Sequence, residues 1–156
     1  MIKLVIFDID GVLTDGKVYV DYLGNESKAY SLTEIDAIDE LKKNGYMIAA
    51  ITGEDTTIVD VFERKIKWNQ FFKGSKDKVS AIKIIENGLG ISSNEICYIG
   101  DGKYDISPIC YVGLGVCPAN AIPQVKEVAD IVLSSCGGDG CVNELLMYLK
   151  ALSRLY

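Results

Sequence analysis

The sequence predicts an α/β fold in which helices cover both faces of a doubly wound, Rossmann-like parallel sheet. Two observations support this class. Short apolar runs alternate with helical patterns along the whole chain, and such alternation is typical of strands buried on both faces. The 156 residues are enough for one domain over 1–156, which needs neither disulfides nor a structural metal to fold.

Five apolar runs are expected to form the buried strands. They cover residues 4–7, 47–51, 96–99, 112–116 and 131–133. Amphipathic helices are expected between and after them as the covering layers. We expect Thr33 to cap the first helix and Asn44-Gly45 to end it. Four helices are each defined by apolar residues at helical spacing. The first has Ile35, Ile38 and Leu41; the second, which begins at about Thr56, has Ile58, Phe62 and Ile66; the third, which precedes Asn87-Gly88, has Val79, Ile82 and Ile85; and the last has Val142, Leu145, Leu146 and Leu149.

One segment breaks this alternation directly after the first strand. Residues 17–22 and 26–31 alternate in polarity around Leu23-Gly24-Asn25, which predicts a β-hairpin inserted over about residues 17–31. A lone hairpin is marginally stable in water. Its apolar side chains, among them Val18, Val20 and Tyr22, therefore favour contact with another subunit.

The composition excludes several classes of protein. Histidine is absent, which excludes Ser-His-Asp and Cys-His nucleophile systems and histidine-ligated zinc. The formal charge of -6 argues against a nucleic-acid partner. No apolar run approaches the ~20 residues of a membrane span and no signal peptide pattern is present, so we expect a cytoplasmic protein without a membrane partner. The five cysteines fit neither a disulfide framework nor a zinc site, and only Cys136 and Cys141 are close enough to check as a pair.

Carboxylates follow two of the expected strands, where open α/β sheets bind their ligands. Asp8 and Asp10 follow the first strand, with Gly11 permitting a turn, and Asp101 and Asp105 follow the run at 96–99. Carboxylates that converge would raise one another's pKa unless a cation lies among them. Magnesium is the natural cation, because it prefers oxygen ligands and is usually held by a few carboxylates and a substrate phosphate.

A phosphate site is predicted beside these carboxylates. Thr52-Gly53 offers a hydroxyl and a flexible backbone N–H at a strand end, and Lys78 offers a positive charge at a helix start. A neighbouring carboxylate could then form an aspartyl-phosphate that water hydrolyses. Each motif alone also fits a turn or a solvated helix residue; their joint occurrence in this order favours phosphate chemistry.

These features resemble the four signature motifs of the haloacid dehalogenase superfamily of phosphatases: Asp8-x-Asp10-Gly-Val-x-Thr14-Asp-Gly, Thr52-Gly53, Lys78 and Gly100-Asp101-x-x-x-Asp105. The chain is further similar to the capless 3-deoxy-D-manno-octulosonate 8-phosphate phosphatase group, which includes 2-keto-3-deoxynononate 9-phosphate phosphatases. This second similarity rests on the short length, the hairpin in place of a cap domain, Gly74-x-x-Asp77-Lys78 and Gly137-Gly138-x-Gly140.

The resemblance implies a Mg²⁺-dependent phosphatase for a sugar-acid phosphate. Asp8 would be the nucleophile and Asp10 the general acid and base. The other implied roles are phosphate binding by Thr52, Gly53 and Lys78, and Mg²⁺ ligation by Asp8, the backbone carbonyl of Asp10 and Asp101, with Asp105 in support. It also implies a homotetramer in which neighbouring subunits close the sites.

Two positions bear on the substrate. The octulosonate branch usually carries Arg after Thr-Gly, whereas this chain has Glu54, with Lys65 further along. At both positions it resembles the nononate 9-phosphate branch, which favours a nononate substrate. Alternatively, Glu54 is a favourable anion near a helix N-terminus and Lys65 is a solvated side chain.

Three departures from the group's pattern motivate a different function. Gly102 stands where the group usually has Asp, Glu34-Ile35 where it has Asp-Gly, and Asn143 where it has Arg. The alternative is a catalytically reduced, oligomeric phosphatase-like binding or scaffold module, against which the intact core motifs weigh. A phosphorelay receiver domain fits less well. Its phosphorylated Asp would lie at the apolar run that comes third along the chain, Gln70-Phe71-Phe72, a shorter run that is not one of the five expected strands, and this run supplies none.

Overall fold

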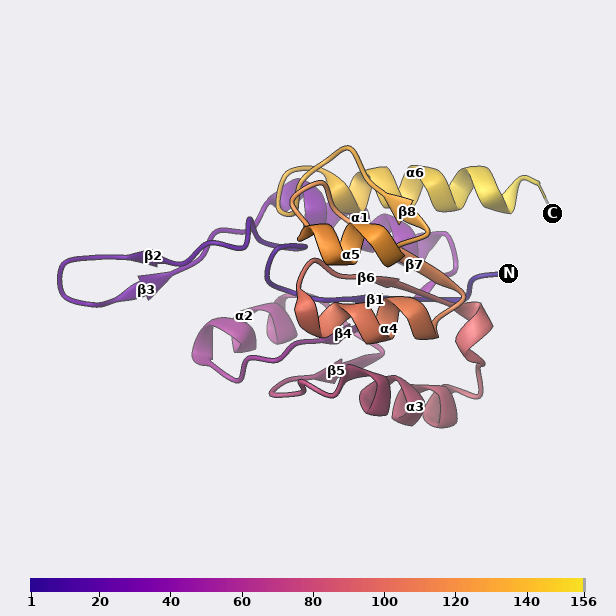
Figure 1. Cartoon of the computed structure of the whole chain (residues 1–156), viewed down its shortest axis with the longest axis horizontal. Helices are drawn as coiled ribbons and strands as arrows, with labels where there is room; N and C mark the ends of the chain where they lie inside the picture. Colours follow the sequence, from indigo (N-terminus) through magenta and orange to yellow (C-terminus); the bar gives the residue numbers. More distant parts are fainter. Residues whose placement is uncertain (156) are drawn as a thin grey trace.

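A six-stranded parallel sheet forms the centre of the molecule (Figure 1). The structure is a computed structural model that describes residues 1–155. In space, the strands follow the order β5-β4-β1-β6-β7-β8. Their bounds are β1 Leu4–Phe7, β4 Met47–Ile51, β5 Gln70–Phe72, β6 Ile96–Ile99, β7 Leu114–Cys117 and β8 Ile131–Val132. The predicted parallel, doubly wound class is confirmed.

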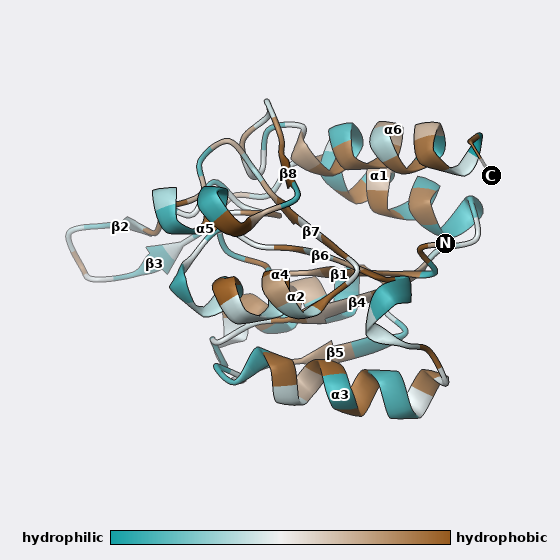
Figure 2. Cartoon of the chain, turned by 45° about the vertical axis from the view of Figure 1, so that its right-hand side comes forward, coloured by the Kyte–Doolittle hydropathy of each residue, from teal (hydrophilic) through white to brown (hydrophobic). Residues whose placement is uncertain are grey.

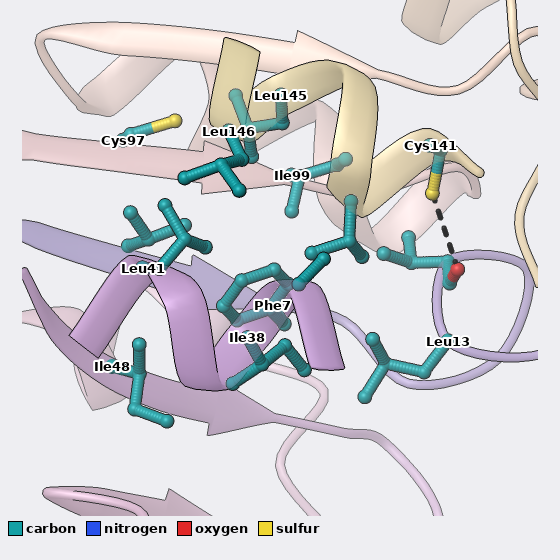
Figure 3. Close-up of a cluster of buried hydrophobic side chains, with 14 of the residues drawn as sticks. Phe7, Leu13, Ile38, Leu41, Ile48, Cys97, Ile99, Cys141, Leu145 and Leu146 are labelled. Carbon is teal, nitrogen blue, oxygen red and sulfur yellow. Dashed lines mark hydrogen bonds between the residues drawn. The ribbon is translucent and has the colours of Figure 1, made fainter. Parts of the chain in front are cut away.

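Helices cover both faces of this sheet, and the strands bury alternate residues on each face, because successive side chains of a strand point to opposite sides. Phe7 and Ile99 face the layer of α1, α2 and α6 (Figure 3), while Ile6 and Tyr98 face α3, α4 and α5. Figure 2 shows the apolar strands between these mixed polar and apolar helices. The bounds are α1 Leu32–Lys43, α2 Thr57–Lys65, α3 Lys78–Leu89, α4 Ile106–Tyr111, α5 Pro123–Val128 and α6 Cys141–Ser153. Within residues 1–155, no helix has the length and apolar character needed to cross a membrane.

The strand order brings three strand ends together. β1 lies between β4 and β6, and the chain builds the β4 side of the sheet before it crosses to β6. All three strands are parallel, so their carboxyl ends share one edge, next to the point where the strand order reverses. Asp8, Thr52 and Asp101 come directly or within two residues after these strands. The topology therefore places these three predicted site residues at one edge.

The insertion after β1 is an antiparallel hairpin that projects from the body of the molecule (Figure 1). Its strands, β2 (Tyr19–Val20) and β3 (Glu26–Ser27), pair over two residues each. Several of its apolar side chains are open to solvent in the single chain, with Val20 62% and Tyr22 93% exposed. The predicted hairpin is confirmed, but its paired part is much shorter than residues 17–31.

The first helix begins earlier than expected. Ser31 is its N-cap residue and the helix starts at Leu32, so the prediction that Thr33 caps it was wrong. The two hydroxyls of Ser31 and Thr33 lie 2.7 Å apart and hydrogen bond to each other instead of to helical N–H groups. The predicted stop is confirmed, since Asn44 is the C-cap and Gly45 has a φ of +90°.

Other predicted boundaries were also wrong. α3 continues past Asn87-Gly88 and ends where Gly90 adopts a left-handed conformation with a φ of 65°. β7 begins at Leu114 and not at Val112, because the Val112 N–H donates to the carbonyl of Pro108 in α4 and takes no part in the sheet. β8 ends before Leu133. The short helices α4 and α5 were not predicted.

Cys136 and Cys141, the two cysteines close enough in sequence to check as a pair, do not form a disulfide. All five are free, and Cys136 is exposed whereas Cys141 is buried. The Cys141 thiol instead donates to the carbonyl of Val12 at 3.3 Å (Figure 3). It therefore packs the start of α6 against the loop after β1.

Glu34, one of the three departures, is a buried capping residue. Its carboxylate accepts hydrogen bonds from the N–H groups of Gly140, at 2.8 Å, and Val142, at 3.0 Å. These are free donors at the start of α6, where a negative charge also suits the helix dipole. Glu34 thus joins α1 to α6, the two helices that cover the same face of the sheet.

We expect Glu34→Ala to lower the free energy of unfolding by about 2–4 kcal/mol, because it leaves two inward-facing N–H groups without an acceptor. Asp39→Ala is the matched control, since Asp39 is exposed on the same helix, and should change stability by less than about 0.5 kcal/mol. Urea unfolding followed by circular dichroism measures both. Equal effects of the two substitutions would show that Glu34 does not support α6.

Candidate active site

The loop after β1 carries Asp8 and is shaped by glycines. Gly11 has a φ of +79°, and a Cβ at this position would overlap the Asp101 carboxylate. A Cβ on Gly137 would overlap the carbonyl of Gly11. The Asn120 side chain joins these segments, because it donates to the Gly11 carbonyl at 3.0 Å and accepts from the Gly137 N–H at 2.6 Å. The late glycine motif therefore packs directly against the Asp8 loop.

Lys78, the first residue of α3, forms ion pairs with carboxylates from two strand ends. Its Nζ lies 3.0 Å from Asp8 Oδ1 and 2.7 Å from Asp105 Oδ1. Burial acts to lower the pKa of Lys78, but the charges of Asp8 and Asp105 raise it above its usual value. The ammonium therefore remains charged, fixes the Asp8 carboxylate and offsets part of its charge.

Asp105 accepts hydrogen bonds at both carboxylate oxygens. Oδ1 accepts from Lys78 and from the Tyr98 hydroxyl, at 2.7 and 2.5 Å. Oδ2 accepts from the N–H groups of Asp101 and Gly102, at 2.9 and 3.0 Å. Burial acts to raise the pKa of Asp105, but the Lys78 charge and these bonds lower it. Asp105 is thus placed to hold both Lys78 and the loop after β6.

Three carboxylates form a cluster that could hold a metal ion. One oxygen from each of Asp8, Asp101 and Asp105 lies within 4.8 Å of the others. Burial and the Asp105 charge raise the pKa of Asp101 to about 6, and the same two causes raise the pKa of Asp8 well above its usual value. Lys78 offsets one of the three negative charges, and a divalent cation would offset the other two. An all-oxygen donor set fits a hard cation.

A pocket of about 210 Å³ opens beside this cluster. Thr52 is buried in its wall, and its hydroxyl oxygen accepts the Glu54 N–H at 3.3 Å, which leaves the hydroxyl hydrogen available as a donor. The structure brings the predicted nucleophile, acid and phosphate-binding residues together here. The residues that line the pocket are Asp8, Asp10, Thr52, Gly53, Glu54, Lys76, Lys78, Gly102, Tyr104 and Asp105.

Of the two predicted specificity residues, Glu54 lines the pocket and Lys65 does not. Lys65 lies on α2 with its Nζ 5.1 Å from the centre of the Tyr30 ring, within the range of a cation–π contact. Tyr30 in turn packs edge-on against Phe62 of α2. In the single chain, Lys65 therefore contacts the segment that returns from the hairpin.

Gly102 and Asn143, the other two departures from the phosphatase group's pattern, lie in different parts of the structure. Gly102 lines the pocket with a φ of -114°, which any residue can adopt, so the backbone does not require glycine there. Asn143 is exposed in the first turn of α6. Neither departure disturbs the contacts among Asp8, Lys78 and Asp105.

Sequence reasoning missed Lys76 and Tyr104 of the pocket wall, and three further residues that make hydrogen bonds at the site. Lys28, beyond β3, places its Nζ 2.8 Å from Asp10 Oδ1 and 2.7 Å from Glu54 Oε2. Tyr98 has the pattern of a core strand residue, which hides its hydroxyl contact. Asn120 lies three residues after β7, so the preference of ligands for strand ends could have indicated it. No sequence pattern indicated Lys28, because its partners are distant in the chain.

A larger pocket, of about 320 Å³, lies at the opposite edge of the sheet. Its wall is mainly apolar and includes Ile2, Leu114, Leu149 and Leu152. Among the described residues, no carboxylate or lysine lines it. The smaller pocket at the carboxyl ends of the strands is therefore the candidate active site, because it combines charged groups with a possible metal site.

Comparisons with known proteins agree with this geometry. A family model described as haloacid dehalogenase-like hydrolase matches residues 55–145. The 3-deoxy-D-manno-octulosonate 8-phosphate phosphatase of Haemophilus influenzae is 31% identical over 144 residues, which cover 92% of this chain and 80% of that protein.

Solved structures show the same likeness. A structure from Legionella pneumophila, assigned to subfamily III A of the haloacid dehalogenase superfamily, superposes with a TM-score of 0.91 at 37% identity, covering 96% of this chain and 82% of that one. A second structure is the 3-deoxy-D-manno-octulosonate 8-phosphate phosphatase of Moraxella catarrhalis, solved with a magnesium ion, a phosphate ion and a KDO molecule. It superposes with a TM-score of 0.89 at 32% identity, covering 96% of this chain and 87% of that one. The chain thus belongs to the haloacid dehalogenase-like hydrolase family, as its strand-end motifs indicated.

Proposed function

We propose that this chain is a magnesium-dependent phosphatase that hydrolyses a 2-keto-3-deoxy sugar-acid phosphate through an aspartyl-phosphate on Asp8. The observation that carries the proposal is the placement of Asp8 between Lys78 and the Asp101 loop, at a pocket that Thr52 also lines. The likeness to octulosonate 8-phosphate phosphatases supports the substrate class. We further propose that residues 1–156 act as one catalytic domain in the cytoplasm, where five free cysteines would remain reduced.

Asp8, Asp101 and the backbone carbonyl of Asp10 would hold the magnesium ion, with Asp105 supporting them. When bound, the ion would offset negative charge on the carboxylates and on the phosphate, so that a dianionic substrate can approach Asp8. The related Moraxella structure contains magnesium and phosphate together, which supports this assignment.

In the first chemical step, a carboxylate oxygen of Asp8 attacks phosphorus as the bond from phosphorus to the sugar oxygen breaks. Asp10 gives its proton to that leaving oxygen. Thr52, the Gly53 N–H and Lys78 hold the phosphoryl oxygens in the line of attack. In the second step, water attacks phosphorus while Asp10 takes its proton. The bond to Asp8 breaks, and inorganic phosphate leaves.

We propose a nononate 9-phosphate as the favoured substrate over octulosonate 8-phosphate. Glu54 supports this, because its carboxylate lines the pocket beside Asp10, where a sugar hydroxyl could donate to it. Lys65 would act in this selection only if a bound sugar or a neighbouring subunit approaches α2. The core contacts of Asp8, Lys78 and Asp105 weigh against a module that only binds or scaffolds.

We expect Asp8→Asn to abolish phosphate release, and Asp10→Asn to slow turnover by about 10²- to 10⁴-fold with little effect on substrate binding. Removal of metal by a chelator should stop the wild-type enzyme, and added Mg²⁺ should restore it. Phosphate release and mass spectrometry of the phospho-enzyme measure these effects, with Asp39→Asn as an exposed control. Undiminished hydrolysis by contaminant-free Asp8→Asn protein would contradict the mechanism.

Glu54→Arg should lower kcat/KM for nononate 9-phosphate relative to octulosonate 8-phosphate, because it replaces an acceptor for sugar hydroxyls with a cation. We expect the ratio of the two kcat/KM values to change by about tenfold or more. Glu63→Arg, an exposed charge reversal on α2, is the control and should leave the ratio unchanged. An unaltered ratio in Glu54→Arg would mean that Glu54 does not read the sugar.

We also propose that the chain forms a homotetramer in which the hairpins contact neighbouring subunits. The hairpin supports this, since it projects from the body and exposes Val18, Tyr19, Val20, Tyr22 and Leu23. Apolar side chains and unpaired strand edges of this kind are covered at low cost by a second copy of the same hairpin.

Val20→Asp should dissociate this assembly, because it places a carboxylate in the apolar contact, and should reduce activity by opening the pocket to water. Val128→Asp, at an exposed apolar residue of α5, should do neither. Light scattering coupled to size-exclusion chromatography measures the mass. A fully active wild-type species of 17.1 kDa would refute the tetramer.

A further inference from the structure

Lys28 links the hairpin to two carboxylates of the candidate active site. Its ammonium lies 2.8 Å from Asp10 Oδ1 and 2.7 Å from Glu54 Oε2, so one side chain joins the loops after β1 and β4. Residues 16–27 are all exposed, whereas the side chain of Lys28 is 5% exposed. A lysine side chain with so little exposed surface, held between two carboxylates, is unlike a solvated lysine of a surface hairpin.

Asp10 has few other partners. Within residues 1–155, its carboxylate also contacts the Thr14 hydroxyl, at 3.5 Å, which is the outer limit of a hydrogen bond. Asp8, by contrast, is held by Lys78 and by the Ile9 N–H at 2.9 Å. The nucleophile is thus fixed by the body of the fold, while the acid is fixed mainly by a residue of the hairpin segment.

The ammonium is suited to this position. Burial acts to lower the pKa of Lys28, but the hydrogen bonds from Lys28 to Asp10 and Glu54 outweigh it and raise that pKa. Asp10 and Glu54 both line the pocket and would otherwise repel each other. Tyr30, two residues further along the chain, packs on Phe62 and anchors this segment to α2.

We propose that Lys28 is a positioning residue for the acid–base step: it holds the Asp10 carboxyl beside the leaving oxygen and couples that placement to the hairpin and to Glu54. This inference rests on the proposed phosphatase function and deepens it. Lys28 gives up no proton in either step; Asp10 donates to the sugar oxygen as the phosphorus–oxygen bond breaks, and later accepts from water.

The role can be tested by the acidity of the leaving group. A sugar alkoxide needs a proton from Asp10 to leave, whereas p-nitrophenolate leaves without one. Misplacement of Asp10 should therefore slow formation of the phospho-enzyme from a sugar phosphate but not from p-nitrophenyl phosphate. The hydrolysis step, which uses Asp10 as a base, should slow with both substrates.

The experiment compares full-length wild-type protein with Lys28→Gln, Lys28→Arg and the control Lys17→Gln, an exposed lysine at the start of the hairpin. We expect Lys28→Gln to lower kcat on octulosonate 8-phosphate or nononate 9-phosphate by about 10- to 100-fold, with KM within about threefold of the wild-type value. With p-nitrophenyl phosphate, stopped flow should show a burst of nitrophenolate at the wild-type rate, followed by slow turnover. Lys28→Arg should recover most of kcat, and Lys17→Gln should match the wild type.

Other outcomes would overturn the inference. Unchanged kinetics in Lys28→Gln, or a rise in KM for both substrates without loss of kcat, would mean that Lys28 does not position Asp10. Partial unfolding of the variant would reduce the burst and the turnover of both substrates in proportion. It therefore cannot reproduce an unchanged burst rate together with slow turnover. A wild-type protein without Mg²⁺-dependent phosphatase activity would overturn the proposed function itself, and with it the role of Lys28.

Discussion

The ion pairs of Lys78 with Asp8 and Asp105 are the interaction on which the rest of the site depends. Three carboxylates meet at the carboxyl ends of β1 and β6, and burial makes their charges costly. Lys78 compensates for one of them and fixes Asp8, the proposed nucleophile, in place. The remaining negative charge explains why the site fits a divalent cation and, through that cation, a phosphate ester. The chemistry follows from how this charge is balanced.

The fold supplies the rigidity that such a cluster needs. β1, β4 and β6 are adjacent and parallel, so their loops meet without any long connection inside the site. Close backbone contacts complete the packing, because Gly11 and Gly137 leave no room for a side chain between the loops. The capping of α6 by Glu34 secures the segment that contains Gly137. By contrast, the carboxylate of Asp10, the proposed acid, is paired with Lys28, which belongs to the projecting hairpin segment.

Much of the fold and of the site could be predicted, because it follows from local patterns and from the rule that strand ends share one edge. This holds for the parallel sheet except β5, which was not among the five expected strands, for the four longer helices, and for the placement of Asp8, Asp10, Thr52, Lys78, Asp101 and Asp105. Cap choice at Ser31 and the short helices α4 and α5 could not be predicted, since they depend on tertiary contacts that propensity does not encode. Lys28 and Glu34 were not identified for the same reason. Their partners lie 18 to 108 residues away, and a lysine or glutamate in an amphipathic segment has the pattern of a solvated residue.

Calorimetric titration of metal-free protein with Mg²⁺ tests the central claim most directly. We predict a single ion per chain, bound more tightly at about pH 7.5 than at about pH 5, because protonation of Asp101, whose pKa is about 6 in the metal-free protein, competes with the metal at the lower pH. Asp101→Asn should weaken binding by about tenfold or more. Mg²⁺ binding of equal strength in the wild type and in Asp101→Asn, or none in the wild type, would contradict the account.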